Sequence, residues 1–120
     1  MQNNREVGTK YEQLVGGYLE EKGYQILTYN YRCKIGEIDI VAKDKEQLVF
    51  IEVKYRKNLS MGSPLAAVTH KKQQTISKCA KFYMMCNNCY DMSVRFDVVG
   101  IVGQGDNMEM NHLVNAFDYC

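Results

Sequence analysis

The alternation of apolar and polar residues is most regular between residues 36 and 56. Two β-rich runs, Ile38–Lys43 and Leu48–Tyr55, flank a polar break at residues 44–47, which is typical of a β-hairpin. Successive side chains of a strand point to opposite faces, and both faces of the second run are largely apolar. We therefore expect the second run to be a central strand that is covered on both sides.

Three charged side chains interrupt this apolar pattern. Glu52 and Lys54 share one face of the second run, and a hairpin can bring Asp39 beside them. Strict alternation in the first run also predicts that Ile38 and Ile40 point one way and Asp39 the other. Buried charges cost free energy unless they are paired, solvated or bound to a metal ion.

Two acids and a lysine at one strand end fit a divalent-metal site. Mg²⁺ prefers hard oxygen ligands and usually takes one or two carboxylates, with water and substrate phosphate completing its shell. Such a metal lowers the pKa of bound water, and Lys54 could orient or help to deprotonate that water. A solvated Glu52–Lys54 ion pair, with Asp39 in a turn, explains the same spacing, so the spacing alone leaves both interpretations open.

Helical spacing of apolar residues predicts a first helix over about Glu6–Lys22, which ends at Gly23. Glu12 lies at the edge of its apolar stripe. It could lean over the sheet toward Asp39 and Glu52, or it could be an ordinary solvated helix acid.

A second helix is predicted from about His70, preceded by a short turn that begins near Leu65. Gln73 continues its apolar stripe, where it could hydrogen-bond a lysine, water or phosphate, or could be a boundary residue. Lys72 beside it is expected to face solvent or phosphate. The loop Lys57–Pro64 before this helix is a candidate substrate-facing flap.

Residues 24–31 and 94–102 are predicted to be the first and last strands, and Asp97 in the last strand is assigned a structural role. Residues 111–119 are expected to pack back on the body of the protein. The order helix, strand, strand, strand, helix, strand predicts an α/β fold with a mixed sheet flanked by helices. We expect residues 1–120 to form one domain.

Composition narrows the function classes. The sequence contains no apolar run near 18 residues and no apolar signal segment at its start, so we expect a cytoplasmic protein without a membrane partner. The net charge of +1 does not indicate a nucleic-acid partner by itself. Lysines and arginines do gather after Glu52 and again from Lys71 to Lys81, which is compatible with phosphate contacts, although scattered lysines more commonly mark a solvated helix face.

The chain contains five cysteines, an odd number, and we expect reduced thiols. Cys86 and Cys89 form a Cys-x-x-Cys pair. A zinc site would need two more ligands from among Cys79, Cys120 and His112, in no standard spacing; free thiols at a helix end are the alternative.

The segment Gly36-Glu37-Ile38-Asp39, followed by Val49-Phe50-Ile51-Glu52-Val53-Lys54, resembles the Asp…Glu-x-Lys core of the PD-(D/E)xK nuclease superfamily. Nearly the whole chain is similar to the YraN family of small bacterial endonuclease-like proteins, which are related to archaeal Holliday-junction resolvases. Further matching segments are Gly8, Tyr11-Glu12, Asn30-Tyr31-Arg32, Gly62-Ser63-Pro64, Ala67-Val68-Thr69, Lys72-Gln73, Arg95-Phe96-Asp97-Val98-Val99 and Asn115-Ala116-Phe117.

The resemblance implies a restriction-endonuclease-like fold. It assigns metal-ligand roles to Asp39 and Glu52, with the Val53 carbonyl as a further ligand, and the catalytic lysine role to Lys54. It also assigns supporting roles in the catalytic site to Glu12 and Gln73.

The function implied by the resemblance is a Mg²⁺- or Mn²⁺-dependent nuclease that acts on DNA rather than RNA, including branched or structured DNA. A symmetric junction would favour a homodimer. A non-catalytic nucleic-acid-binding module and a protein-interaction module on the same fold are the alternatives, because a fold does not fix a function.

Overall fold

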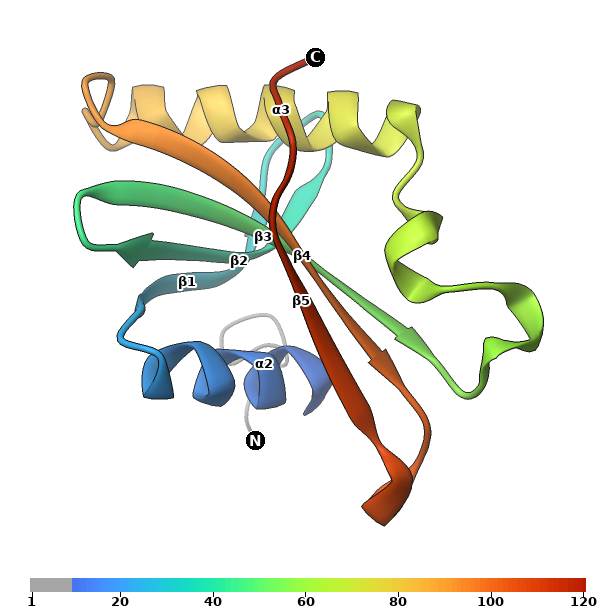
Figure 1. Cartoon of the computed structure of the whole chain (residues 1–120). Helices are drawn as coiled ribbons and strands as arrows, with labels where there is room; N and C mark the ends of the chain where they lie inside the picture. Colours follow the sequence, from blue (N-terminus) through green and yellow to red (C-terminus); the bar gives the residue numbers. More distant parts are fainter. Residues whose placement is uncertain (1–9) are drawn as a thin grey trace, which may run out of the picture.

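The computed structural model describes residues 10–120 as a five-stranded mixed sheet with a helix on each face (Figure 1). The part of the predicted first helix before Lys10, and Gly8 with it, lies outside the described residues. The sheet and its two helices confirm the predicted α/β class and are compatible with a restriction-endonuclease-like fold. In chain order the elements are α2 (Lys10–Glu21), β1 (Gln25–Arg32), β2 (Glu37–Asp44), β3 (Gln47–Arg56), η1 (Leu59–Met61), η2 (Pro64–Ala67), α3 (His70–Cys86), β4 (Ser93–Val102), η3 (Gly105–Asn107) and β5 (Glu109–Phe117).

The strands lie in the order β1-β2-β3-β4-β5, so β3 is central, as its apolar faces predict. β3 and β4 are parallel and the other pairs are antiparallel. The parallel pair needs a crossover, which α3 supplies. Within residues 10–120, no helix has both the length and the apolar character needed to cross a bilayer.

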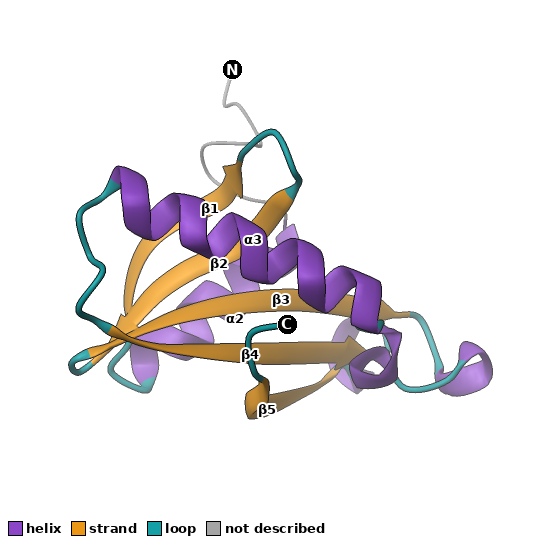
Figure 2. Cartoon of the chain, turned by 90° about the horizontal axis from the view of Figure 1, so that it is seen from above, coloured by secondary structure: helices purple, strands orange, loops and turns teal. Residues whose placement is uncertain are grey.

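Two apolar layers hold the helices on the sheet. Figure 2 shows α3 in front of the sheet and α2 behind it. Leu48 and Phe50 of β3 pack in the layer under α3, whereas Val49 and Ile51 pack in the layer under α2. The alternation read from the sequence of β3 therefore holds, and each face of this strand is covered by its own helix.

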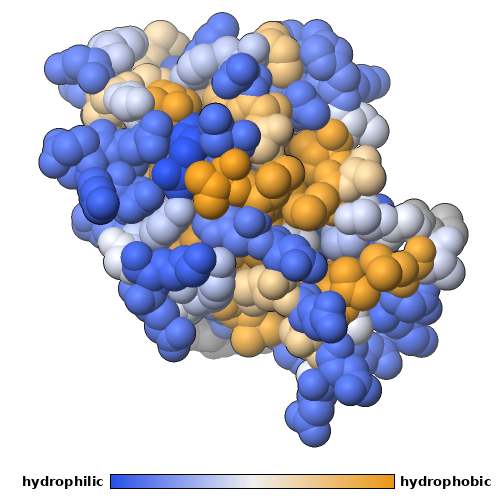
Figure 3. Space-filling model, in the orientation of Figure 1, coloured by the Kyte–Doolittle hydropathy of each residue, from blue (hydrophilic) through white to orange (hydrophobic). Residues whose placement is uncertain are grey.

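β5 is the element that the sequence pattern did not reveal. It pairs with β4 and forms one edge of the sheet, where the sequence predicted only a packing segment. Leu113 and Val114 on this strand are 44% and 49% exposed. Figure 3 views the molecule from the side of β5 and shows apolar atoms gathered on that side.

The expected alternation in β2 is wrong at Ile38. Ile38 packs in the layer under α3, whereas Ile40 packs in the layer under α2. Pairing of β2 with β3 ends at the Ile40–Ile51 pair, and beyond it the Asp39 carboxylate accepts a hydrogen bond from the Val53 N–H. A side chain thus takes the place of a backbone partner, and the strand changes face at Asp39.

Gly100 on β4 lets the segment before α3 approach the sheet beside Lys54, its partner on β3. A Cβ at Gly100 would lie 2.8 Å from Cγ of Pro64, which belongs to a rigid ring. We expect Gly100→Ala to lower the free energy of unfolding by about 1–3 kcal/mol, measured by urea denaturation. Gly17→Ala is the control, because no described atom lies within 4 Å of the added methyl group and alanine favours α2; an equal loss in both variants would contradict the close approach.

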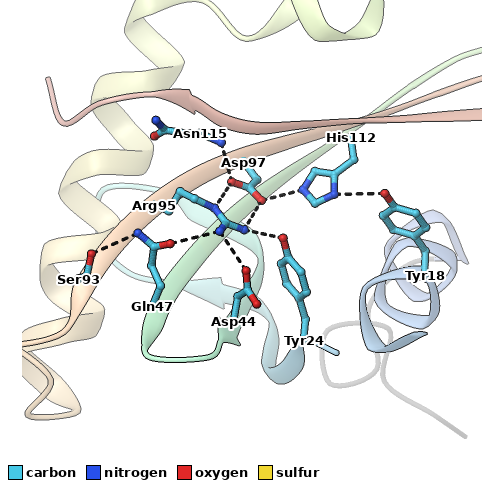
Figure 4. A network of polar contacts seen from close by, with 9 residues as sticks. All are labelled: Tyr18, Tyr24, Asp44, Gln47, Ser93, Arg95, Asp97, His112 and Asn115. Atoms are coloured by element: carbon cyan, nitrogen blue, oxygen red, sulfur yellow. Dashed lines mark hydrogen bonds and ion pairs between the residues drawn. The ribbon is translucent and has the colours of Figure 1, made fainter. Parts of the chain in front are cut away.

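A polar network ties β4 to β5, to the β2–β3 hairpin and to α2 (Figure 4). Asp97 is completely buried and accepts hydrogen bonds from Arg95, His112 and the Asn115 N–H. Burial alone would raise the pKa of Asp97, but these donors outweigh it and hold that pKa below its ordinary value. The structural role predicted for Asp97 is thus the anchoring of β5 and the β2–β3 hairpin. The other members of the network are Tyr18, Tyr24, Asp44, Gln47 and Ser93.

Candidate functional site

The end of the β2–β3 hairpin brings Asp39 and Glu52 together. Asp39 Oδ2 lies 2.8 Å from the Val53 backbone nitrogen, which fixes this carboxylate against β3. Glu52, the neighbour of Val53, has a side chain only 3% exposed. The two acids therefore meet where β2 separates from the β3 ladder, a place with little water to screen their charges.

Two lysines approach the same oxygen of Glu52. The Lys54 ammonium lies 3.3 Å from Oε2, and the Lys72 ammonium lies 3.6 Å from it. Their side chains are 28% and 34% exposed, so both ammonium groups also reach solvent. The cluster thus has a buried anionic centre and a cationic rim.

Among residues 10–120, two buried side-chain atoms have no hydrogen-bond partner, and both belong to the C-terminal half of β3. They are Glu52 Oε1, an acceptor, and Arg56 Nε, a donor. Arg56 donates from Nη1 to the Tyr55 carbonyl, but its Nε–H has no acceptor. Buried groups without partners cost free energy and call for an explanation.

The proximity of the two acids shifts the protonation of Asp39. Burial, and then the neighbouring carboxylate of Glu52, raise the pKa of Asp39 to about 9, although the Val53 N–H opposes this. The charge of Glu12 adds to the rise. At neutral pH Asp39 therefore keeps its proton, and a cation that displaced this proton would relieve the repulsion between the two carboxylates.

This shift predicts a pH dependence for the stability of the metal-free protein. Asp39 keeps its proton up to about pH 9 in the folded chain but loses it near its ordinary pKa of 3.8 when unfolded. Because the folded state then binds more protons, stability should fall as pH rises between these values, by up to about 1.4 kcal/mol per unit.

Chelator-treated protein unfolded in urea between pH 5 and 9 would measure this slope. Asp39→Asn should flatten it, whereas Asp91→Asn, a change at an exposed turn residue, should leave it unchanged. Parallel slopes for the parent and Asp39→Asn would contradict the raised pKa of Asp39.

The two supporting residues suggested by the resemblance occupy different places. Glu12 on α2 is 7% exposed, and it lies near enough to Asp39 for its charge to raise the pKa of Asp39. Gln73 donates from Nε2 to the Val68 carbonyl at 3.2 Å, so it fastens α3 to the segment before it. Its predicted contact with a lysine, water or phosphate stays a prediction.

The contact of Lys72 with Glu52 is the feature that sequence reasoning missed. Lys72 was expected to face solvent or phosphate, yet its ammonium reaches a nearly buried carboxylate. A signal was present, because Lys72 stands four residues before Ile76 and so continues the apolar stripe of α3. Thr69 caps this helix by accepting from the Lys72 N–H.

The donor set limits which metal would fit. No group of three His, Cys, Asp or Glu side chains that could hold a metal ion occurs in residues 10–120. Two carboxylates, one with an unsatisfied buried oxygen, fit Mg²⁺ or Mn²⁺, which bind through few protein ligands and retain water. Cys86 is exposed and His112 is bonded to Asp97 and Tyr18, so the zinc alternative gains no support from their surroundings.

Comparison with known proteins identifies the relatives of this chain. A family model described as uncharacterised protein family UPF0102 matches residues 11–101. The chain belongs to the UPF0102 family. This confirms the predicted YraN resemblance. The matched segment of this UPF0102 chain includes Asp39, Glu52 and Lys54.

Individual relatives match along nearly their whole length. A UPF0102 protein of Carboxydothermus hydrogenoformans is 44% identical over 117 residues, covering 98% of this chain and 99% of the relative. A UPF0102 protein of Lachnoclostridium phytofermentans is 44% identical, covering 97% and 96%. A UPF0102 protein of Clostridioides difficile is 42% identical, covering 96% and 99%. These family names state no activity, so a function has to be argued from the site.

Proposed function

We propose that this UPF0102 protein is a Mg²⁺- or Mn²⁺-dependent phosphodiester hydrolase that acts on DNA, with branched or structured DNA as its substrate class. The observation that supports this most is the pair of unsatisfied atoms on β3. Glu52 Oε1 is a buried acceptor suited to a cation, and Arg56 Nε is a buried donor suited to an anion. A divalent metal ion together with a phosphate group would satisfy both.

Asp39 and Glu52 would hold the cation, with the Val53 carbonyl as a further ligand. A bound divalent cation supplies a water of lowered pKa and neutralises charge on the phosphate. Asp39 must release its proton for this, and the charge of the bound cation would favour that release. Lys54, whose ammonium is 3.3 Å from Glu52, would orient the hydrolytic water.

The cationic rim would contact the nucleic-acid backbone. Arg56 lies on the same face of β3 as Glu52 and Lys54, and its Nε–H is available there as a hydrogen-bond donor. Lys57 is exposed immediately after β3, and Lys72 can leave Glu52 once a cation neutralises this acid. Glu12 and Gln73 would steady the arrangement from α2 and α3.

The proposal is tested by offering the pure protein linear, flapped and four-way-junction DNA, and the matching RNA, with Mn²⁺ and with a chelator. We expect cleavage of at least one DNA substrate that depends on the metal. Lys54→Ala should lower the rate by about 10²–10⁴-fold while keeping most of the DNA affinity. Lys78→Ala, a change at an exposed lysine further along α3, is the matched control and should cleave normally.

Failure of the protein to cut any substrate would contradict the hydrolase. If DNA still bound, the site would belong to a nucleic-acid-binding module. If Mn²⁺ calorimetry gave the same heat for the parent and Asp39→Asn, the acids would bind no metal, and a protein-interaction role would be favoured. Sedimentation with a four-way junction would show whether two copies bind together, as a symmetric substrate requires.

A further inference from the structure

Two of the five cysteines meet between the β1–β2 turn and α3. The Sγ atoms of Cys33 and Cys79 lie 3.2 Å apart, although the residues are 46 positions apart in the chain. Both are free thiols. A disulfide bond needs its sulfurs at about 2.05 Å, so a small approach of the turn would bring them to bonding distance.

Close packing holds the two sulfurs in place. The turn is closed by a hydrogen bond from the Cys33 N–H to the Gly36 carbonyl. A Cβ at Gly36 would lie 2.6 Å from the Thr75 methyl group and 3.7 Å from the Cys79 sulfur, so the turn lies directly on α3. The contact of the sulfurs is therefore a consequence of the way the turn fits the helix.

The two thiols differ in access and in acidity. Cys79 is completely buried, whereas Cys33 is half-buried and lines an open cleft of about 350 Å³ with Arg32, Gly36 and Glu37. Burial alone would raise the pKa of Cys33, but the Cys79 thiol and the N–H groups of Ile35 and Gly36 hold it below the ordinary value. Burial, and then Cys33, raise the pKa of Cys79 to about 12. Cys33 is thus the thiol that can attack an external disulfide, and Cys79 is the buried thiol that can then displace the attached group from Cys33.

We propose that Cys33 and Cys79 form a reversible intramolecular disulfide by exchange with a small disulfide of the glutathione class. The Cys33 thiolate attacks one sulfur of the reagent, breaks its S–S bond and releases one thiolate, which takes a proton from water. Cys79 then attacks the Cys33 sulfur, breaks the mixed disulfide and passes its proton to the departing thiolate, which leaves as the second thiol. Two protein thiols are oxidised, and one small disulfide is reduced to two thiols.

The bond would join two parts that carry the candidate site. Asp39 follows Cys33 by six residues through the turn into β2. Lys72, which pairs with Glu52, precedes Cys79 by seven residues on α3, so the two lie on one side of that helix. Oxidation would therefore fix the position of β2 relative to α3, whatever reaction the site performs.

The test is to incubate the folded protein with glutathione disulfide and then to count thiols after denaturation in acid. We expect two of the five thiols to disappear, with a mass loss of about 2 Da and a linked pair of peptides containing Cys33 and Cys79. Cys33→Ser should prevent the loss. A variant with both Cys86→Ser and Cys89→Ser is the control and should still form the bond.

Three results would overturn the proposal. One is a stable mixed disulfide on Cys33 with Cys79 still reduced. Another is a link that involves Cys86, Cys89 or Cys120 instead. The third is a lower urea midpoint for the oxidised protein than for the reduced protein, because a bond that suits the native contact should raise the midpoint.

Discussion

Glu52→Gln is expected to weaken Mn²⁺ binding by at least about 100-fold, since even residues that only support metal ligands cost 10–100-fold when they are changed. Under the proposed function it should also lower the cleavage rate on the order of 10³-fold. The amide keeps the shape of the side chain but removes the charge from the unsatisfied Oε1. Calorimetric titration with Mn²⁺ measures the first effect without reference to any substrate.

The matched control is Glu37→Gln. Glu37 precedes Asp39 by two residues on β2 but forms a 3.0 Å ion pair with Arg32, and its side chain is 37% exposed. Glu37→Gln should leave the Mn²⁺ affinity within about 2-fold of the parent value, because exposed ion pairs contribute little. Equal weakening by both variants would mean that the measured heat reports diffuse charge rather than a site at Glu52.

The sequence predicts best where one element repeats a simple period. β3 and α3 were predicted correctly because apolar residues recur at strand spacing from Leu48 onward and at helix spacing as far as Met84. β5 was missed because a bulge opposite Asp97 interrupts its alternation. Asn115, in that bulge, has a positive φ of 55° and turns its N–H toward the carboxylate.

The candidate site, too, could be predicted only where local sequence patterns determine it. Pairing of neighbouring strands was enough to place Asp39 beside Glu52, because only a short turn separates their strands. The apolar stripe of α3 turns Lys72 toward the sheet, but the residue that Lys72 contacts there depends on how α3 lies on the sheet. The unsatisfied atoms of Glu52 and Arg56 could not be predicted either, since a missing partner becomes visible only once every neighbour has been placed.

The largest loss of stability is expected from Asp97→Asn, at about 3 kcal/mol. This change removes a buried charge that faces the Arg95 guanidinium at 2.8 Å and His112 Nε2 at 2.7 Å. Arg95 is only 11% exposed, and it would keep Asp44 as its remaining acid at 3.1 Å. That second partner makes us expect the lower end of the range for a broken buried pair.

Urea denaturation at pH 7 would measure the loss, with Asp106→Asn in the exposed η3 turn as a control that should change stability by less than about 0.5 kcal/mol. The pH dependence provides a second check. Because the folded pKa of Asp97 lies below its ordinary 3.8, its ionised form stabilises the protein above that pH, and this contribution is lost as pH falls through the folded value. The difference between the parent and Asp97→Asn should therefore shrink below about pH 4. A difference that stayed constant into acid would mean that the shape of the side chain, and not its charge, anchors β5.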